Sequence, residues 1–321
     1  MNRVSRLLGV LLFGLTGLLQ GCITVNLLEP AGPAQEVTLT GTGDGKVLLL
    51  DLSGVISAQD KDGLFPQPNM LAAFKEDLVK ASKDESVKAL ILRVNSPGGT
   101  VTASDILYHE LRAFKASKKI PVITSMMDLA ASGGYYAAMA SDTIFVHPST
   151  VTGSIGVIML TVNAKGLLEK VGMEANAITS GPRKDMGSPF RTMTEEERTI
   201  FQGVIDSFYH RFLAVVQEGR PQLSADQIRK LADGRIYSGA QAKAAGLVDE
   251  IGYLDDAIEL AKKKSGLTEA RVVTYRRHGE YQNNIYSKMF GGGSGWNSLA
   301  NLDLVSLVRG GSPQFMYMWM P

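Results

Sequence analysis

From Lys46 onward the sequence alternates short apolar runs with segments of helical spacing, and this alternation restricts the fold more than any other feature. Short apolar runs bounded by turn residues are typical of buried strands, and amphipathic segments of ten or more residues are typical of helices. Such an order predicts βαβ units in a mostly parallel sheet with helices on its faces. We therefore expect an α/β protein with a helical C-terminal half.

The expected elements follow from the periodicity of the apolar residues. Strands are expected at Val47–Leu52, Val87–Val94, Pro121–Met126, Thr143–Val146, Ser154–Met159, Ala175–Thr179 and Arg271–Tyr275. Helices are expected at Met70–Lys83, Ala103–Ser117, Gly134–Met139, Ala164–Val171, Thr194–Glu218, Ser224–Ala232, Ser238–Ala245 and Leu254–Lys264. The longest of these helices opens with a capping signal, in which Thr194 is followed three residues later by Glu197.

A serine among small residues stands between the third strand and the short helix after it. Ser132 is preceded by two alanines and followed by Gly133 and Gly134, so that a peptide could approach its backbone. At a strand-to-helix turn, free N–H groups and the positive end of the helix dipole would stabilise an oxyanion. We interpret Ser132 as a candidate nucleophile. Alone, the same residues also suit a helix packed tightly on a sheet.

A second glycine pair falls one βαβ unit earlier, in the loop Asn95-Ser-Pro-Gly-Gly99. The loop follows the end of an expected parallel strand, which is the edge where open α/β sheets place their sites. The N–H of one of its glycines, together with that of Gly133, could form an oxyanion hole. An ordinary turn is the alternative interpretation.

A base for Ser132 is expected in the loop Ser180-Gly-Pro-Arg-Lys-Asp185, where Lys184 lies 52 residues after the serine. A lysine accepts a proton only in its neutral form, which burial favours by lowering the pKa of an ammonium group. The alternative is a solvent-exposed basic loop. Ser154, 22 residues after Ser132, could orient the lysine amine or simply cap its own backbone.

The four histidines, His109, His147, His210 and His278, are not flanked by small residues that would let a substrate approach. Because sequence distance does not exclude a triad, His147 is kept as the alternative base. The sequence contains no His/Cys/carboxylate cluster with the spacing of metal ligands. We therefore expect neither a metal nor an organic cofactor.

The beginning of the chain has the features of a lipoprotein signal peptide. Arg3 and Arg6 precede an apolar stretch, Leu7–Leu19, that is short for a membrane span. Leu19-Gln-Gly-Cys22 resembles a lipobox, and Cys22 is the single cysteine, so an intrachain disulfide is excluded. We expect cleavage before Cys22 and stable anchoring by several acyl chains. A transmembrane anchor over residues 7–28 is the alternative.

These features divide the chain into a signal peptide at 1–21, a lipid-anchored tether at 22–45, a domain at 46–275 that carries Ser132 and Lys184, and a C-terminal extension at 276–321. The tether is rich in Gly and Pro and has no sustained period. In the extension, Gly291–Gly295 is expected to be a flexible joint, and the apolar end Phe315–Met320 to pack against a neighbouring subunit. The net charge of +1 argues against nucleic acid as a partner.

Together the motifs resemble those of the signal peptide peptidase A family. The resemblance covers about Lys46 to Lys264 and rests on Asn95–Gly99, Ser132–Tyr136, Thr152–Val157, Ser180–Asp185 and Gly234–Gly239, with Gly246–Asp249. It implies the Clp-protease/crotonase architecture of repeated ββα units and a serine peptidase that cleaves apolar segments such as residual signal peptides. The implied roles are Ser132 as nucleophile, Lys184 as general base, Ser154 as the hydroxyl that orients the lysine, and Gly99 with Gly133 as oxyanion donors.

The resemblance also implies an assembly and a location. Double-length relatives carry the lysine in the first repeat and the serine in the second, so a single-repeat chain is expected to use a neighbour's lysine in a homo-oligomeric ring. The lipobox predicts a bacterial cell envelope protein, anchored by lipid, with its catalytic domain outside the cytoplasm. Ile23, where many inner-membrane lipoproteins carry aspartate, is compatible with the outer membrane. The alternatives are an inactive lipoprotein scaffold and a crotonase-type acyl-CoA enzyme, which would leave Ser132 and Lys184 unexplained.

Overall fold

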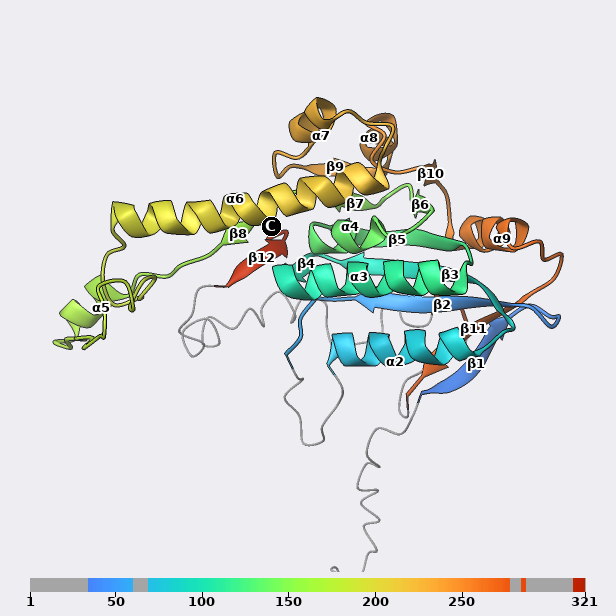
Figure 1. The fold of residues 1–321 in the computed structure, drawn as a ribbon, viewed down its shortest axis with the longest axis horizontal. Helices are drawn as coiled ribbons and strands as arrows, with labels where there is room; N and C mark the ends of the chain where they lie inside the picture. The colour runs from blue at the N-terminus through green and yellow to red at the C-terminus, as the bar shows by residue number, and fades with distance from the viewer. Residues whose placement is uncertain (1–33, 60–68, 278–283, 287–313, 321) are drawn as a thin grey trace, which may run out of the picture.

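The computed structural model describes residues 34–59, 69–277, 284–286 and 314–320 (Figure 1). The expected signal peptide, Cys22 and Gly291–Gly295 lie outside these residues. The strands are β1 (Gln35–Thr40), β2 (Lys46–Ser53), β3 (Val87–Ser96), β4 (Gly98–Thr100), β5 (Val122–Ala131), β6 (Thr143–Val146), β7 (Val151–Gly153), β8 (Ile158–Met159), β9 (Ile236–Ser238), β10 (Glu250–Ile251), β11 (Arg271–Arg276) and β12 (Phe315–Met318). The helices are α2 (Met70–Lys83), α3 (Val101–Lys118), α4 (Gly133–Ala138), α5 (Lys165–Lys170), α6 (Glu195–Gly219), α7 (Ala225–Leu231), α8 (Gly239–Ala244) and α9 (Leu254–Lys264).

A large, mostly parallel sheet runs through the body of the molecule in the strand order β1-β11-β2-β3-β5-β6-β10. Strands β11, β2, β3, β5, β6 and β10 pair in parallel, and β1 pairs antiparallel with β11 at one edge. The short β7 pairs with the end of β5 and carries β9 on its other side. The α/β fold expected from the alternating pattern is confirmed.

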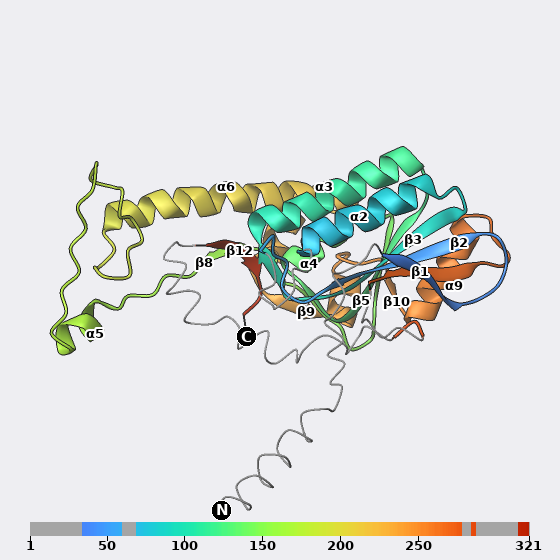
Figure 2. The same ribbon diagram turned by 90° about the horizontal axis from the view of Figure 1, so that it is seen from below.

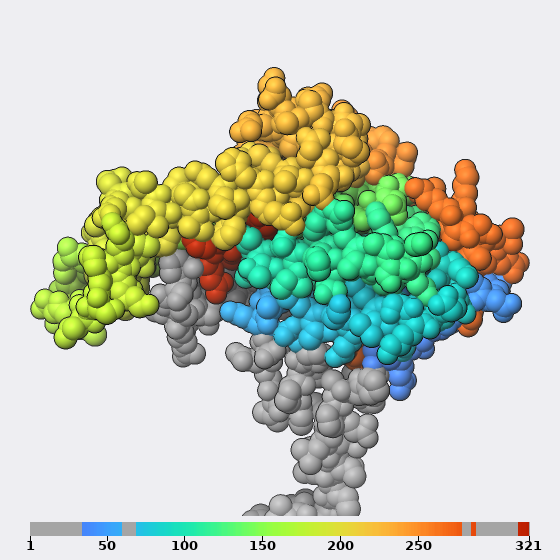
Figure 3. Space-filling view, in the orientation of Figure 1, coloured from blue at the N-terminus to red at the C-terminus, as the bar shows by residue number. Residues whose placement is uncertain are grey.

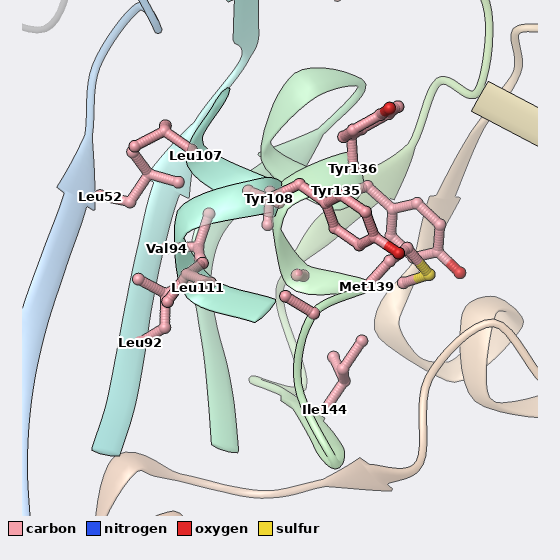
Figure 4. Close-up of a cluster of buried hydrophobic side chains, with 14 of the residues drawn as sticks. Leu52, Leu92, Val94, Leu107, Tyr108, Leu111, Tyr135, Tyr136, Met139 and Ile144 are labelled. Atoms are coloured by element: carbon pink, nitrogen blue, oxygen red, sulfur yellow. The ribbon is translucent and has the colours of Figure 1, made fainter. Parts of the chain in front are cut away.

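The two faces of the sheet are buried by different helices, because successive side chains of a strand point to opposite faces. In β2, Leu48 and Leu50 belong to a buried cluster that includes residues of α2, α3 and α4, part of which is drawn in Figure 4. The alternate residues Val47 and Leu49 belong to a second cluster, closed by α9. The sheet is thus buried on both faces, and its strands read as continuous apolar runs.

The strand expected at Ser154–Met159 forms only over its last two residues, as β8, and two further local expectations are wrong. Residues 35–40, assigned to a tether, form β1, which pairs with β11 over Gln35–Arg276 to Thr40–Val272. A six-residue strand is too short for its alternating pattern to be recognised in the sequence. Its partner β11 lies more than 200 residues away along the chain. The run Ala175–Thr179, expected to be a strand, has no regular structure and is exposed. Its apolar residues have no neighbouring strand within the described part of the chain.

The C-terminal tail packs against its own chain and not, as expected, only against a neighbour. Strand β12 pairs antiparallel with β4 on one side and with β8 on the other, forming a second, three-stranded sheet. Tyr317, at its centre, is fully buried. The apolar end is therefore covered within one molecule, which removes the hazard that an exposed apolar tail would present.

Residues 160–194, here called the arm, project from the body between β8 and α6. Figures 1 and 2 show α5 and the turns after it at the far end of α6, away from the sheet, and Figure 3 shows the same segment standing clear of the body. Large apolar side chains on the arm are exposed: Leu160, Leu167, Val171, Met173, Ile178 and Phe190. The arm therefore has an apolar surface that the described part of the chain leaves exposed.

Candidate active site

Ser132 occupies a strained turn at the end of β5. Its backbone has φ 51° and ψ −113°, a positive-φ conformation that non-glycine residues rarely adopt. The conformation is held because the Ser132 N–H donates to the Gly153 carbonyl at 2.7 Å and the Ser132 carbonyl accepts from Tyr136 N–H in α4. The strand-to-helix turn predicted at Ser132 is confirmed. Strain of this kind concentrates at functional sites.

Ser154 occupies the equivalent place on the neighbouring strand. Because Ala131 of β5 pairs with Gly153 of β7, the two serines follow directly after paired residues. Ser154 also has a positive φ, 49°, and its N–H donates to the Arg235 carbonyl at 2.8 Å. Apart from Lys119 at a helix end, these two serines are the non-glycine residues with positive φ in the described part of the chain.

The Ser132 hydroxyl is buried but unpaired. The residue is 1% exposed, and among the described residues its Oγ has no hydrogen-bond partner. Buried hydroxyls are nearly always paired in folded proteins, because an unmade hydrogen bond costs about 1–3 kcal/mol. Within the described part of the chain, no group accepts a hydrogen bond from this hydroxyl.

Glycines bring the β4 loop into contact with the Ser132 turn. A methyl group placed on Gly99 would overlap the carbonyl oxygen of Ile56, which pairs with Gly99 across an isolated bridge. A methyl on Gly133 would overlap the Ser104 hydroxyl, and one placed on Gly98 would be 2.6 Å from the Gly133 nitrogen. Only residues without a side chain allow this approach. The two expected oxyanion donors, Gly99 and Gly133, are thus on adjoining backbone segments.

Lys184 lies on the arm, in the loop between α5 and α6, and is exposed. In Figures 1 and 2 this loop stands at the opposite end of α6 from α4, the helix that begins just after Ser132. No hydrogen bond or ion pair of the Lys184 ammonium group occurs among the described residues. The structure therefore brings Ser132, Gly133, Gly99 and Ser154 together, but not Lys184 of the same chain.

An ionic clamp fixes the loop that carries Lys184. The Arg191 guanidinium donates to Asp185 Oδ2 and Oδ1 at 2.7 and 2.9 Å, and to Glu197 Oε2 at 3.0 Å. These hydrogen bonds from Arg191 hold the pKa of both carboxyl groups below their usual values. Glu197 also completes the predicted capping box with Thr194 at the start of α6. The sequence identified the cap but not its connection to the lysine loop.

None of the described histidines forms a hydrogen bond with Ser132 Oγ. His147 Nδ1 pairs with Ser149 Oγ at 2.8 Å, and the His147 ring packs edge-on against Tyr253 with centroids 4.7 Å apart. His109 and His210 are exposed on helices, and His278 lies outside the described residues. Within the described ranges no cluster of His, Cys, Asp and Glu could hold a metal ion. None of the helices described there has the length and apolar character needed to cross a bilayer.

Two features of the site were not found from the sequence. One is the positive φ of Ser132 and Ser154, for which neither residue type gives a signal. The other is β12, which pairs with the strand that carries Gly99. The apolar composition of the tail indicated that it needs a partner, but not which one.

Two protein-family models and several known proteins match this chain. The family model "Peptidase family S49" matches residues 114–268, and the model "Clp protease" matches residues 67–152, so Ser132 lies in the overlap. A protein of Enterococcus faecium named as a signal peptide peptidase, SppA, is 41% identical over 243 residues, which are 75% of this chain and 70% of that protein.

Longer relatives match over a smaller share of their length. Protease 4 of Salmonella typhi is 40% identical over 188 residues, covering 57% of this chain and 30% of that protein. The chloroplastic serine protease SPPA of Arabidopsis thaliana is 33% identical over 238 residues, covering 74% of this chain and 35% of that protein. The chain therefore spans about a third of the length of these two relatives.

Proposed function

The chain belongs to peptidase family S49 and is a serine peptidase, and from its site we propose a Ser132–Lys184 mechanism that operates between two protomers. In this proposal Ser132 of one chain meets Lys184 on the arm of a neighbour. The observation that carries it is the unpaired, buried Ser132 Oγ in a chain whose own Lys184 stands on a projecting arm. The family membership favours a peptidase over an acyl-CoA enzyme.

The proposed reaction is acyl transfer. Neutral Lys184 takes the Ser132 proton while Oγ attacks the scissile carbonyl carbon, and the resulting oxyanion accepts hydrogen bonds from the N–H groups of Gly99 and Gly133. The lysine ammonium then protonates the leaving amine as the C–N bond breaks. Water hydrolyses the acyl-enzyme and regenerates the Ser132 hydroxyl. Ser154, beside Ser132 at the paired strand end, is proposed to orient the lysine amine.

A neighbouring copy would also bury Lys184, which is exposed in the single chain. A general-base lysine must lose its proton near neutral pH, and burial is the usual means of lowering the pKa of an ammonium group. The exposed apolar residues of the arm, with Ile178 fully exposed, are the kind of surface that marks a protein interface. Repeated docking of one arm on the next body would close a ring.

We further propose a lipoprotein that acts on apolar peptides at the membrane of a bacterial envelope. Support comes from the lipobox at Cys22 and from the Enterococcus relative, which is named as a signal peptide peptidase. Replacement of Cys22 by serine should release the full-length chain from the membrane fraction. Residual signal peptides and other unfolded apolar segments are the proposed substrates.

Mixing two inactive variants tests the shared site. Ser132→Ala and Lys184→Ala should each reduce peptide hydrolysis by about 1,000-fold or more. If each site combines one serine with a neighbour's lysine, equal amounts allowed to exchange subunits should regain about a quarter of the wild-type activity. Lys165→Ala, on the same arm and equally exposed, is the matched control and should stay active. No recovery, with exchange verified by labelled subunits, would refute the shared site.

A further inference from the structure

The loop that carries Gly99 is held by a serine side chain that has no role in the reaction described above. Ser96 is the last residue of β3 and is fully buried. Its Oγ donates a hydrogen bond to the Gly54 carbonyl at 2.6 Å and accepts one from the Gly98 N–H at 3.0 Å. A hydroxyl has a single proton to donate, so the bond to Gly54 fixes its orientation and leaves a lone pair for Gly98.

Two successive peptide groups before Gly99 are fixed by hydrogen bonds. Ser96 Oγ holds the N–H of the Pro97–Gly98 peptide group. In the next peptide group, the Gly98 carbonyl accepts from the Ile56 N–H at 2.8 Å. The C=O and N–H of a trans peptide point in opposite directions, so the Gly99 N–H is directed away from Ile56. The direction of this expected oxyanion donor therefore depends on both hydrogen bonds.

The loop needs such a restraint because its own backbone is permissive. Gly98 has a φ of 98°, in a region that glycine enters freely, and it has no side chain to limit rotation of the adjoining peptide groups. Ser96, in contrast, is fixed in the sheet, where it pairs with Ala130 of β5. A methyl group on Gly134 would stand 3.0 Å from the Ser96 carbonyl oxygen. Ser96 thus connects the flexible loop to the strand and helix that flank Ser132.

Resting on the proposed roles of Ser132 and Gly99, we propose that Ser96 is a positioning residue whose hydroxyl directs the Gly99 N–H towards the oxyanion. Among the described residues Ser132 Oγ has no hydrogen-bond partner, so Ser96 acts through the loop and not on the nucleophile. The oxyanion exists only after Oγ attacks the carbonyl carbon. A misdirected Gly99 donor should therefore weaken binding of the transition state and leave binding of the substrate unchanged.

Replacement of Ser96 by alanine tests this role in the full-length chain. Ser96→Ala removes one oxygen atom, and hydrolysis of a quenched fluorescent signal-sequence peptide measures the result. We expect kcat to fall about 10- to 100-fold with KM within about two-fold, a smaller loss than removal of a whole oxyanion donor causes. Thr124→Val is the matched control. Thr124 is also fully buried in the sheet, its Oγ1 pairs with Ser141 Oγ at 2.7 Å, and both constants should stay within about two-fold.

A peptide aldehyde provides a second readout of the same donor. Ser132 Oγ would form a bond to the aldehyde carbon while the hydroxyl proton passes to the Lys184 amine, and the carbonyl oxygen becomes an oxyanion beside Gly99. In Ser96→Ala its inhibition constant should rise by about the factor by which kcat/KM falls. The corresponding peptide alcohol forms no oxyanion and should bind equally well to both proteins. Inhibition constants and KM do not depend on how much of each variant folds.

The outcomes separate the role of Ser96 from the mechanism. A lower kcat and weaker aldehyde binding in Ser96→Ala alone support the assignment. An unchanged kcat, a loss confined to KM, or an equal loss in Thr124→Val would overturn it and leave the Ser132 mechanism intact. Undiminished hydrolysis by Ser132→Ala would overturn the mechanism and the role of Ser96 with it.

A second substitution keeps the test decisive if Ser96→Ala does not fold. Ser96→Cys fills the same place with a group that donates and accepts hydrogen bonds only weakly. Its kcat should fall several-fold, with KM unchanged and the aldehyde bound more weakly by a similar factor. A wild-type kcat in Ser96→Cys would overturn the proposed role.

Discussion

The two halves of the proposed site differ in how they are built. Around Ser132, residues 130–140 and 96–99 are buried, glycines allow contacts that a methyl group would prevent, and two serines are held at positive φ. Around Lys184, the chain is a projecting arm with exposed apolar side chains and an ionic clamp. The nucleophile half is completed by its own fold. The base half presents a surface that a neighbour would have to complete.

The two halves should therefore tolerate different kinds of substitution. The Ser132 half depends on atomic fit, so small additions there should be destructive. In the proposed assembly the arm docks on a neighbour, so changes there should affect assembly and activity while leaving the folded body unaltered.

The largest effect is expected from adding one methyl group to each half. Gly99→Ala would drive a Cβ into the Ile56 carbonyl and should lower the free energy of unfolding by about 3 kcal/mol, with loss of activity. A Cβ added at Gly181, on the arm, has no atom within 4 Å. Gly181→Ala should therefore change the free energy of unfolding by less than about 0.5 kcal/mol. Urea unfolding measures both. Equal losses would show that the two halves do not differ in packing.

A charge on the arm should separate assembly from folding. Ile178→Asp alters a fully exposed side chain, so the midpoint of urea unfolding should stay the same. Because a buried carboxylate at an interface is costly, the proposed ring should dissociate and peptide hydrolysis should fall about ten-fold or more. Sedimentation velocity measures the mass. Val79→Asp, on the exposed face of α2, is the control; if it dissociated the assembly equally, the interface would not be specific to the arm.

The smallest effect is expected from the clamp that holds the lysine loop. Arg191→Gln removes the hydrogen bonds to Asp185 and Glu197 and should lower kcat/KM roughly five-fold, through a displaced Lys184. Arg198→Gln, which breaks only the exposed pair with Glu195, should have no effect. An unchanged rate in Arg191→Gln would show that the loop is positioned by other contacts.

The clamp should also lose stability in acid, and the lowered pKa values of its carboxyl groups fix the direction of this change. The pKa values of Asp185 and Glu197 are lowered by their hydrogen bonds from Arg191. A group whose pKa is lower when folded adds stability above its unfolded pKa and loses it as the pH falls through the lowered value. Hydrogen exchange of residues 183–197 should therefore show protection retained at pH 5 and lost below about pH 4. Arg191→Gln should abolish this pH dependence.

The candidate site could be predicted only in part. Ser132, Gly133, Gly99 and Ser154 were recognised as a set, and the structure brings them together at adjoining strand ends. The sequence placed Lys184 in a loop, which is correct, but gave no distance between that loop and Ser132. A loop has no internal repeat that fixes its direction. Whether it folds back or projects depends on tertiary contacts.

The sequence by itself determined the local structure: the buried strands, the helices with their caps, and the serine at a strand-to-helix turn. These follow from side-chain periodicity and capping chemistry within a few residues. Only the tertiary structure decided that β1 joins the sheet, that Lys184 stands away from Ser132, and that Tyr317 of β12 lies against Gly99. These features arise where segments far apart in the sequence meet, and pairing between such segments is chosen by the packing of the whole chain.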